Sequence, residues 1–273
     1  MPRTDRLGIM MSLVMVGLAL SMSVFLPSRE FTFLVFGSEL SLHLSGQAQL
    51  AFVMTALVCA GVDAIIRTHP LAYRRPLGYT ITFWVLPSLI TVAGLIILPI
   101  LPWWGYQVLF IVSTSILLAL VIVAQYRSID PEDQHHRTAR LALNAVVYAA
   151  ALVLFVALYR SHARSAISAT GVLAVSGLFA LELLRVAQDR SRRTWLYALL
   201  TGALMGELTW ALNYNSIEAQ VGGAMLLLVF YVLTGLLQQH LWGRLNRRVV
   251  AEFGLIFVAG LAILGGFVRW FRG

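Results

Sequence analysis

The feature that most constrains this chain is a series of apolar runs, each about 20 residues long, that recurs from one end to the other. A helix of about 20 apolar residues crosses the hydrocarbon core of a bilayer, so each run predicts a transmembrane helix. Nine runs qualify: residues 8–27, 47–66, 79–101, 105–125, 141–159, 167–187, 195–214, 221–240 and 252–270. We therefore predict an all-α polytopic membrane protein with one transmembrane domain over residues 1–273.

The composition agrees with a lipid environment. The 273 residues are 59% hydrophobic and 12% charged, whereas an average soluble domain is about 45–50% apolar and about 25% charged. Membrane lipids are thus the expected surroundings of the chain. The first run follows Arg3 and Arg6 and exceeds the roughly 7–15 apolar residues of a signal peptide, so we expect a retained anchor.

The arginines predict the orientation. Nine spans place 15 of the 20 basic residues on one side, and short loops rich in arginine stay in the cytoplasm. The N-terminus is then cytoplasmic and the C-terminus external, in a cytoplasmic (inner) membrane. Only a tight turn at residues 101–104 separates the predicted spans 79–101 and 105–125.

Several classes of chemistry are excluded by what the sequence lacks. It has no lysine, so it cannot form the Schiff base of retinal or pyridoxal proteins. A single cysteine, Cys59, excludes an internal disulfide and a cysteine-rich metal site. The arginines form no single patch, which argues against nucleic acid as a partner. Paired histidines in mid-membrane, GxSxG and P-loop motifs are also missing, so we expect no catalytic residues, metal or cofactor.

One external segment, residues 29–45, has the alternating pattern of a β-hairpin around Gly37-Ser38. Pairing across that turn puts six apolar residues on one face: Phe31, Phe33, Val35, Leu40, Leu42 and Leu44. Strands with unpaired edges cannot cross lipid, so we expect this hairpin on the outer surface with its apolar face on the helix ends. The alternative is an irregular loop.

Three acids lie within the predicted spans. Asp63 has Arg67 four residues on, and Glu182 has Arg185 three residues on, followed by Asp189. Both spacings predict an ion pair along one helix, near the inner membrane face. We interpret these two acids as structural.

Glu207 differs, because no arginine lies within one helical turn of it. It needs a partner on another helix or a proton, which makes it the main candidate for a site. At 100° per residue, Ala203, Glu207, Trp210 and Tyr214 share one stripe, beside a second stripe of Gly202, Gly206, Thr209 and Asn213. We expect both stripes to face protein, with Gly202 and Gly206 in close helix packing. Leu200, Leu204, Leu208 and Leu212 should face lipid.

Polar residues of other spans are candidate partners of Glu207, because they should lie at a similar depth in the membrane. They are Tyr231, Thr234 and Gln238 on one span, Asn144 and Tyr148 on another, and Trp84, Ser88 and Thr91 on a third, where Pro87 should kink the helix. The predicted ligand-binding set is Glu207, Trp210, Asn213, Tyr214, Tyr231, Thr234 and Gln238. A hydrogen bond between helices is the alternative for each.

The segment from Glu207 through Trp210 and Asn213 to Tyr214, with the glycine-started span after it, resembles an uncharacterised family of bacterial polytopic membrane proteins over the last quarter of the chain. The resemblance implies an integral membrane protein without an assigned activity. It also implies that Glu207, Trp210 and Asn213 are the residues to test.

Three functions stay open at this point. The first is binding or transport of a small or lipid-like ligand around Glu207. The second is a structural or accessory subunit that associates with a membrane protein partner. The third, an intramembrane enzyme with Glu207 as acid or base, is disfavoured by the missing motifs.

Overall fold

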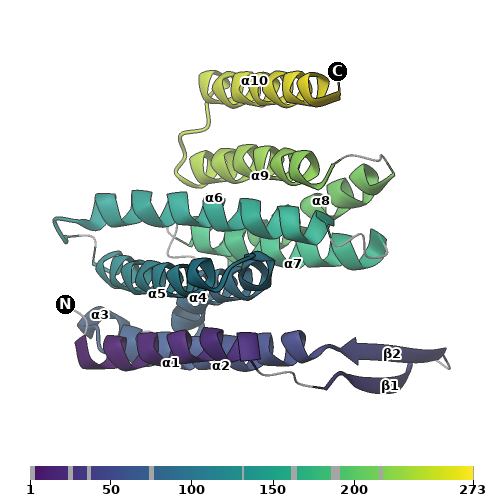
Figure 1. Ribbon diagram of the computed structural model, residues 1–273. Coiled ribbons are helices and arrows are strands. Elements are labelled where there is room, and N and C mark those ends of the chain that lie inside the picture. The colour runs from purple at the N-terminus through teal and green to yellow at the C-terminus, as the bar shows by residue number, and fades with distance from the viewer. Residues whose placement is uncertain are drawn as a thin grey trace. The chain divides into compact units, whose positions relative to one another are not determined.

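The computed structural model describes residues 4–23, 27–35, 38–73, 77–130, 132–160, 165–185, 191–214 and 218–272. Within these ranges it contains nine long helices (Figure 1): α1 (Thr4–Ser23), α2 (Gly46–Ile66), α4 (Leu77–Ile97), α5 (Trp104–Arg127), α6 (His136–Arg160), α7 (Ser165–Leu184), α8 (Ser191–Asn213), α9 (Ala219–Leu241) and α10 (Arg247–Arg272). Two short helices, α3 (Pro70–Tyr73) and the 3₁₀-helix η1 (Leu98–Ile100), complete the helical structure of the described residues.

The all-α membrane architecture is confirmed. In the described part of the chain, eight helices are long and apolar enough to cross a membrane, so the chain is a multi-pass membrane protein. Helix α8 is not among the eight. It has 23 residues, enough to span by length, but Glu207 and several threonines lower its hydropathy. Its crossing, and with it the side of each terminus, stays a prediction.

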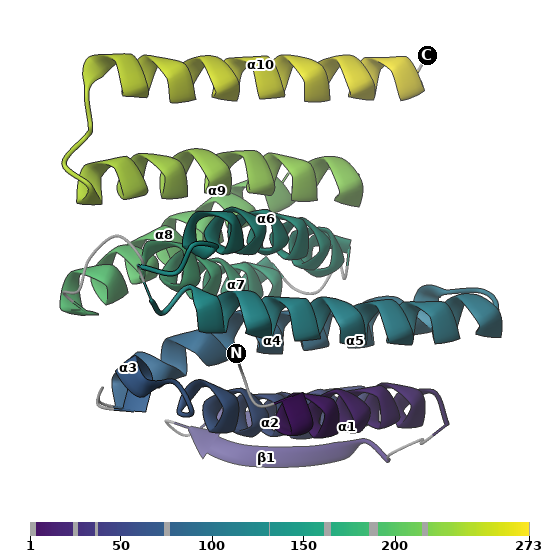
Figure 2. The ribbon, with the colours of Figure 1, turned by 90° about the vertical axis from the view of Figure 1, so that its left-hand side faces the viewer.

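The chain divides into two compact units, Met1–Arg140 and Leu141–Gly273. In the first, α1 packs on α2 and α5, and α4 packs on α2 and α5. The contact between α1 and α2 is reciprocal, because Met54 covers Gly17 and Met10 covers Gly61. Figure 2 shows α1 and α2 running side by side.

The tight turn after α4 separates two full-length helices. Helix α4 continues through Pro87, and the amide of Gln107 in α5 donates to the carbonyl of Leu101 at 3.0 Å. Trp103 and Trp104 lie exposed at the start of α5, with ring centroids 5.6 Å apart. Both helices meet the length and hydropathy of a membrane span, so two separate full-length helices lie at the positions of the two predicted spans.

Between α1 and α2 lie two antiparallel strands, β1 (Arg29–Val35) and β2 (Ser38–Leu44). The register pairs Phe31 with Leu42, Phe33 with Leu40 and Val35 with Ser38. Pairing around Gly37-Ser38 would place Phe31 opposite Leu44, so the observed partners lie two residues from the expected ones. Gly37 lies outside the described residues. The location of this segment on the membrane surface stays a prediction.

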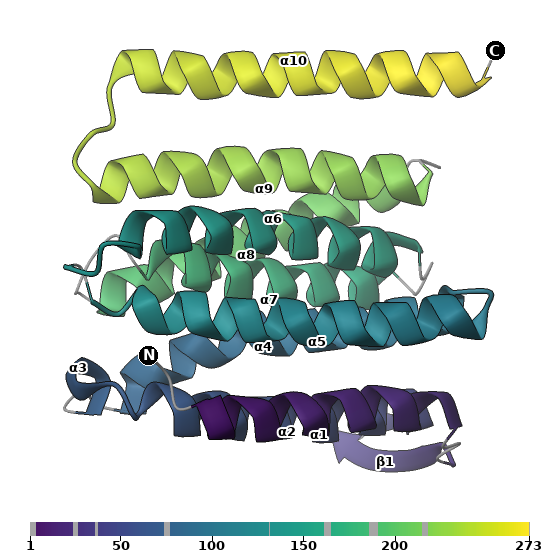
Figure 3. The same ribbon diagram turned by 60° about the vertical axis from the view of Figure 1, so that its left-hand side comes forward.

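In the second unit, α7 and α8 pack along most of their length, and both contact α9. Helix α10 is an edge helix that packs on α9, as Figure 3 shows. Gly243, directly after the C-cap residue Trp242 of α9, adopts the left-handed conformation with φ of 68°, which costs glycine no steric strain. The backbone N–H of Gly243 donates to the carbonyl of His240, and that of Arg244 donates to Gln239.

Candidate functional site

The packed face of α8 is its glycine stripe. A Cβ at Gly202 would lie 2.7 Å from the carbonyl oxygen of Leu173, and a Cβ at Gly206 would lie 3.2 Å from that of Ala169. The backbones of α7 and α8 therefore touch, as the Gly202-xxx-Gly206 spacing predicts. Thr209 of the same stripe is fully buried and bonds back to the carbonyl of Met205 at 2.8 Å.

The neighbouring stripe faces outward, contrary to the sequence-based expectation. Glu207 is exposed, Trp210 is 54% exposed and Tyr214 is 82% exposed. Leu200 and Leu204 share this exposed side, whereas Leu212 is buried. The prediction of one broad protein-facing side was wrong because α7 approaches so closely at the glycines that only a narrow face of α8 is covered. Glu207 lies 100° further round the helix.

Glu207 has no hydrogen bond or ion pair with any residue that the structure describes. Its carboxyl lies six residues before the end of α8, which is roughly 9 Å along the helix axis. Side chains on a helix lean toward its N-terminus, so this carboxyl points away from the nearer helix end. An exposed acid at such a depth is costly in lipid unless something satisfies it.

Asn213 belongs to the packed side of the helix end. Its side-chain amide donates to Oγ of Ser168 in α7 at 2.8 Å. The hydroxyl of Tyr159 in α6 donates to the carbonyl of Leu212 at 3.1 Å. These two bonds fix the last turn of α8, just beyond Glu207. The sequence had no signal for either pairing, because hydroxyl partners on distant helices follow no local spacing.

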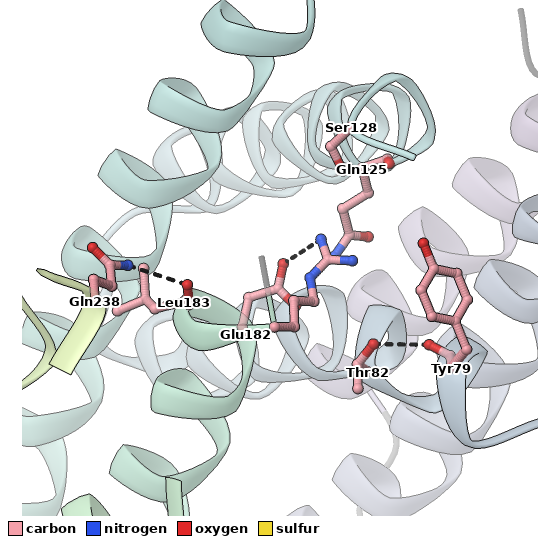
Figure 4. A network of polar contacts seen from close by, with 8 residues as sticks. Tyr79, Thr82, Gln125, Ser128, Glu182, Leu183 and Gln238 are labelled. Atoms are coloured by element: carbon pink, nitrogen blue, oxygen red, sulfur yellow. Dashed lines mark hydrogen bonds and ion pairs between the residues drawn. The ribbon is translucent and has the colours of Figure 1, made fainter. Parts of the chain in front are cut away.

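The polar residues of α9 find partners other than Glu207. The hydroxyls of Tyr148 in α6 and Thr234 lie 3.1 Å apart, and Tyr148 also makes an edge contact with Tyr231, with ring centroids 5.3 Å apart. The amide of Gln238 donates to the carbonyl of Leu183 at 3.1 Å (Figure 4). The predicted ligand-binding set thus separates into an exposed group on α8 and residues that join helices.

The other two acids in the spans behave as the spacing predicts. Nε of Arg67 lies 2.6 Å from Oδ2 of Asp63, and a guanidinium nitrogen of Arg185 lies 2.9 Å from Oε1 of Glu182. Each pair joins two residues about one helical turn apart in the chain. Figure 4 shows Glu182. Asp189, the third member of the predicted ladder, lies outside the described residues.

The polar residues predicted to share a depth on α4, Trp84, Ser88 and Thr91, belong to the protein interior. Oγ of Ser88 lies 3.2 Å from Sγ of Cys59, a hydrogen bond in which either group can donate. The hydroxyl of buried Thr91 donates to the carbonyl of Pro87 at 2.9 Å. Trp84 lies on the same helix, and its indole N–H is buried without a hydrogen-bond partner among the described residues. The Cys59–Ser88 contact joins α2 to α4, and the Thr91 bond stays within α4.

The loop after α5 carries the histidines and acids that fall outside the spans. The backbone N–H of His135 donates to Oδ1 of Asp133 at 2.8 Å, and this bond is the main reason that the pKa of Asp133 is lowered. Nδ1 of His136 lies 3.0 Å from the carbonyl oxygen of Asp130. No group of three potential metal ligands occurs in the described part of the chain.

Chemically, the exposed side of α8 offers the Glu207 carboxyl, with two aromatic rings on its C-terminal side along the chain and leucines on its N-terminal side. The carboxyl can accept hydrogen bonds or balance a positive charge, and the rings supply π-faces. No second titratable group within the described residues bonds to Glu207. The arrangement therefore suits binding better than acid and base catalysis, which needs positioned groups on both sides of a reacting atom.

Comparison with known proteins identifies the family. The chain matches the protein family described as "protein of unknown function (DUF5656)" over residues 26–266. It belongs to the DUF5656 family. This match extends over almost the entire chain and not only the last quarter, where the sequence resemblance was recognised. No curated protein and no solved structure matches this DUF5656 member.

Proposed function

We propose that this DUF5656 protein binds a small or lipid-like ligand on the side of α8 that carries Glu207, Trp210 and Tyr214. The observation that carries the proposal is the exposed Glu207 carboxyl in α8, on a stretch from Thr194 to Asn213 that has no other charged residue. A charged side chain within a membrane helix is costly, up to about 2.5–3.5 kcal/mol at the helix centre, so such residues usually serve a function. A ligand that satisfies the carboxyl would recover that cost.

The binding surface is open to the side and not enclosed between helices. Trp210 lies one turn beyond Glu207, and Tyr214 one further turn beyond Trp210, both exposed. Asn213 and Gln238 support the surface indirectly, because their hydrogen bonds join α8 and α9 to α7. Thr234 contributes through its hydroxyl contact with Tyr148, which joins α9 to α6. A ligand would then enter from the lipid phase, along the helix.

Native mass spectrometry of the purified protein tests the proposal. We expect the wild-type chain to retain a ligand that Glu207→Gln loses, because the amide removes the charge without changing the shape. Glu252→Gln is the matched control, since Glu252 is also an exposed acid on an apolar helix. Identical spectra for the three proteins would overturn the proposal.

A second candidate function, an accessory subunit of a membrane complex, is supported by α10. None of the residues in its membrane-span window, which falls within Arg247–Gly266, is buried. Protein helices in membranes pack through such free faces as well as contacting lipid. Purification in a mild detergent tests this function: a co-purifying membrane protein lost when Leu255 is changed to Arg would support it, and a monomer that retains its ligand would count against it.

A further inference from the structure

The exposed side of α8 combines three kinds of chemistry in order along the helix. Glu207 lies in the middle, Trp210 and Tyr214 follow at i+3 and i+7, and Leu204 and Leu200 precede at i−3 and i−7. Leu196 continues the apolar line at i−11, and all three leucines are about half exposed. At 100° per residue these six side chains share one face of the helix.

We infer that the ligand is an amphiphile with a positively charged ammonium group, bound by Glu207 and Trp210 with its alkyl chain along the leucines. This inference rests on the proposed function and specifies its ligand. A carboxylate balances the charge of an ammonium group, and an indole ring is the best cation–π partner among side chains. An anionic headgroup would be repelled, and a neutral one would use neither interaction.

The dimensions of the surface fit such a molecule. Leu196 lies eleven residues before Glu207, which is roughly 16 Å along the axis, a length that a long alkyl chain can follow. Trp210 lies between the carboxyl and the nearer end of α8 at Asn213, and Tyr214 directly follows that end. An ammonium group that leaves the membrane surface would therefore meet aromatic rings before it reaches the carboxylate.

The chain contains its own matched comparison. Glu252 on α10 is an exposed acid that makes no ion pair with a described residue, although Arg248 stands one turn before it. Leu255 and Ala259 stand where Trp210 and Tyr214 stand relative to Glu207. A site that needed only a carboxyl would form at both acids. A site that needs a carboxyl and aromatic rings would form on α8 alone.

Photolabelling of the full-length protein in dodecyl maltoside micelles, which lack ammonium groups, tests the inference. Three probes share one diazirine-bearing alkyl chain and differ in the headgroup: trimethylammonium, hydroxyl or sulfate. We expect the trimethylammonium probe to label the α8 peptide at least about tenfold more than the others, equivalent to about 1.4 kcal/mol. Glu207→Gln and Trp210→Leu should abolish the preference. Glu207→Asp, Glu252→Gln and Trp195→Leu should preserve it.

The outcomes separate the inference from the proposed function. Equal labelling of α8 by the ammonium and hydroxyl probes, lost in Glu207→Gln, would overturn the ammonium class and leave lateral binding intact. Labelling of α8 no stronger than that of α10 with every probe would overturn both. A preference that persists in Glu207→Gln would show non-specific partition and would also overturn the inference. Elution of each variant as a monodisperse peak controls for folding.

Discussion

The second unit contains two helix pairs, α7–α8 and α9–α10, that pack through glycines in different ways. In the α7–α8 pair the backbones touch, because Gly177 and Gly202 leave no side chain between them. In the α9–α10 pair each contact is a side chain seated on a glycine: Phe253 on Gly235 and Leu228 on Gly260. The first pair is buried along one face, whereas α10 keeps nearly all its surface exposed.

The difference shows that apolarity does not decide which membrane helix is buried. Helix α10 meets the hydropathy of a membrane span and is the least covered, while α8 does not meet it and packs most closely. Lipid is as apolar as leucine, so close packing in a membrane depends on small residues and polar bonds. Helix α8 has both on its packed face. Its remaining face is therefore free to carry Glu207.

The largest expected effect comes from filling the backbone contact. Gly202→Leu would place side-chain atoms where the carbonyl of Leu173 already lies, and backbone cannot move aside. We expect a loss of about 3 kcal/mol in the free energy of unfolding, measured by thermal unfolding in detergent. Gly254→Leu is the control, because a Cβ there meets no described atom within 4 Å. Equal losses of unfolding free energy in Gly202→Leu and Gly254→Leu would contradict the distinction between the α7–α8 and α9–α10 pairs.

A smaller and local effect is expected at the other pair. Gly235→Val removes the space that the ring of Phe253 occupies, but that ring and α10 can shift outward. We expect about 1–2 kcal/mol of destabilisation. Hydrogen exchange should accelerate in α10 and stay unchanged in α8, because the main packing of α10 is on α9. Faster exchange in both helices would contradict independent packing.

The hydrogen bond between α6 and α9 should contribute less than either glycine contact. A double-mutant cycle of Tyr148→Phe and Thr234→Val isolates the pair, whose hydroxyls lie 3.1 Å apart. Hydrogen bonds between membrane helices average about 0.6 kcal/mol in such cycles, and we expect a coupling of that size. A coupling above about 2 kcal/mol would mean that polar bonds, and not backbone approach, dominate this unit.

The smallest effect is a pH dependence confined to the first unit. Burial lowers the pKa of His69, against a weaker opposing attraction from Asp130. The folded state then binds fewer protons than the unfolded state, so stability should fall as the pH drops below about 6.5, the ordinary histidine value. His69→Gln should flatten the stability profile between pH 7.5 and 5.5. A change in α7–α8 stability over the same range would refute this assignment.

Much of the fold followed from local pattern. The nine helices lie at the positions of the nine apolar runs, and the pairs Asp63–Arg67 and Glu182–Arg185 formed at their expected spacings. These features involve neighbours along a single helix, where spacing decides contact. The glycine contact at Gly202 followed for a related reason, since a small-residue repeat admits a close neighbour whichever helix supplies it.

The candidate site was predictable in part. Glu207 was recognised from the sequence because it lacks a basic neighbour, but the direction in which it points was not. That direction depends on how α7 meets α8, and a helical wheel cannot reveal how wide a face one neighbour covers. The pairing of Tyr148 with Thr234 was not predictable either, because depth alone does not distinguish among partners on different helices.

By itself, the sequence determined that the chain is a membrane protein, which stretches of it form the nine long helices, and which acid within them lacks a neutralising neighbour. These properties depend on the hydropathy and spacing of residues close along the chain. The tertiary structure alone decided which side of α8 is covered and that Glu207, Trp210 and Tyr214 lie together on an open surface. The physical reason is that the backbone contact at Gly202 and Gly206 sets the rotation of α8, and that contact joins residues distant in the chain.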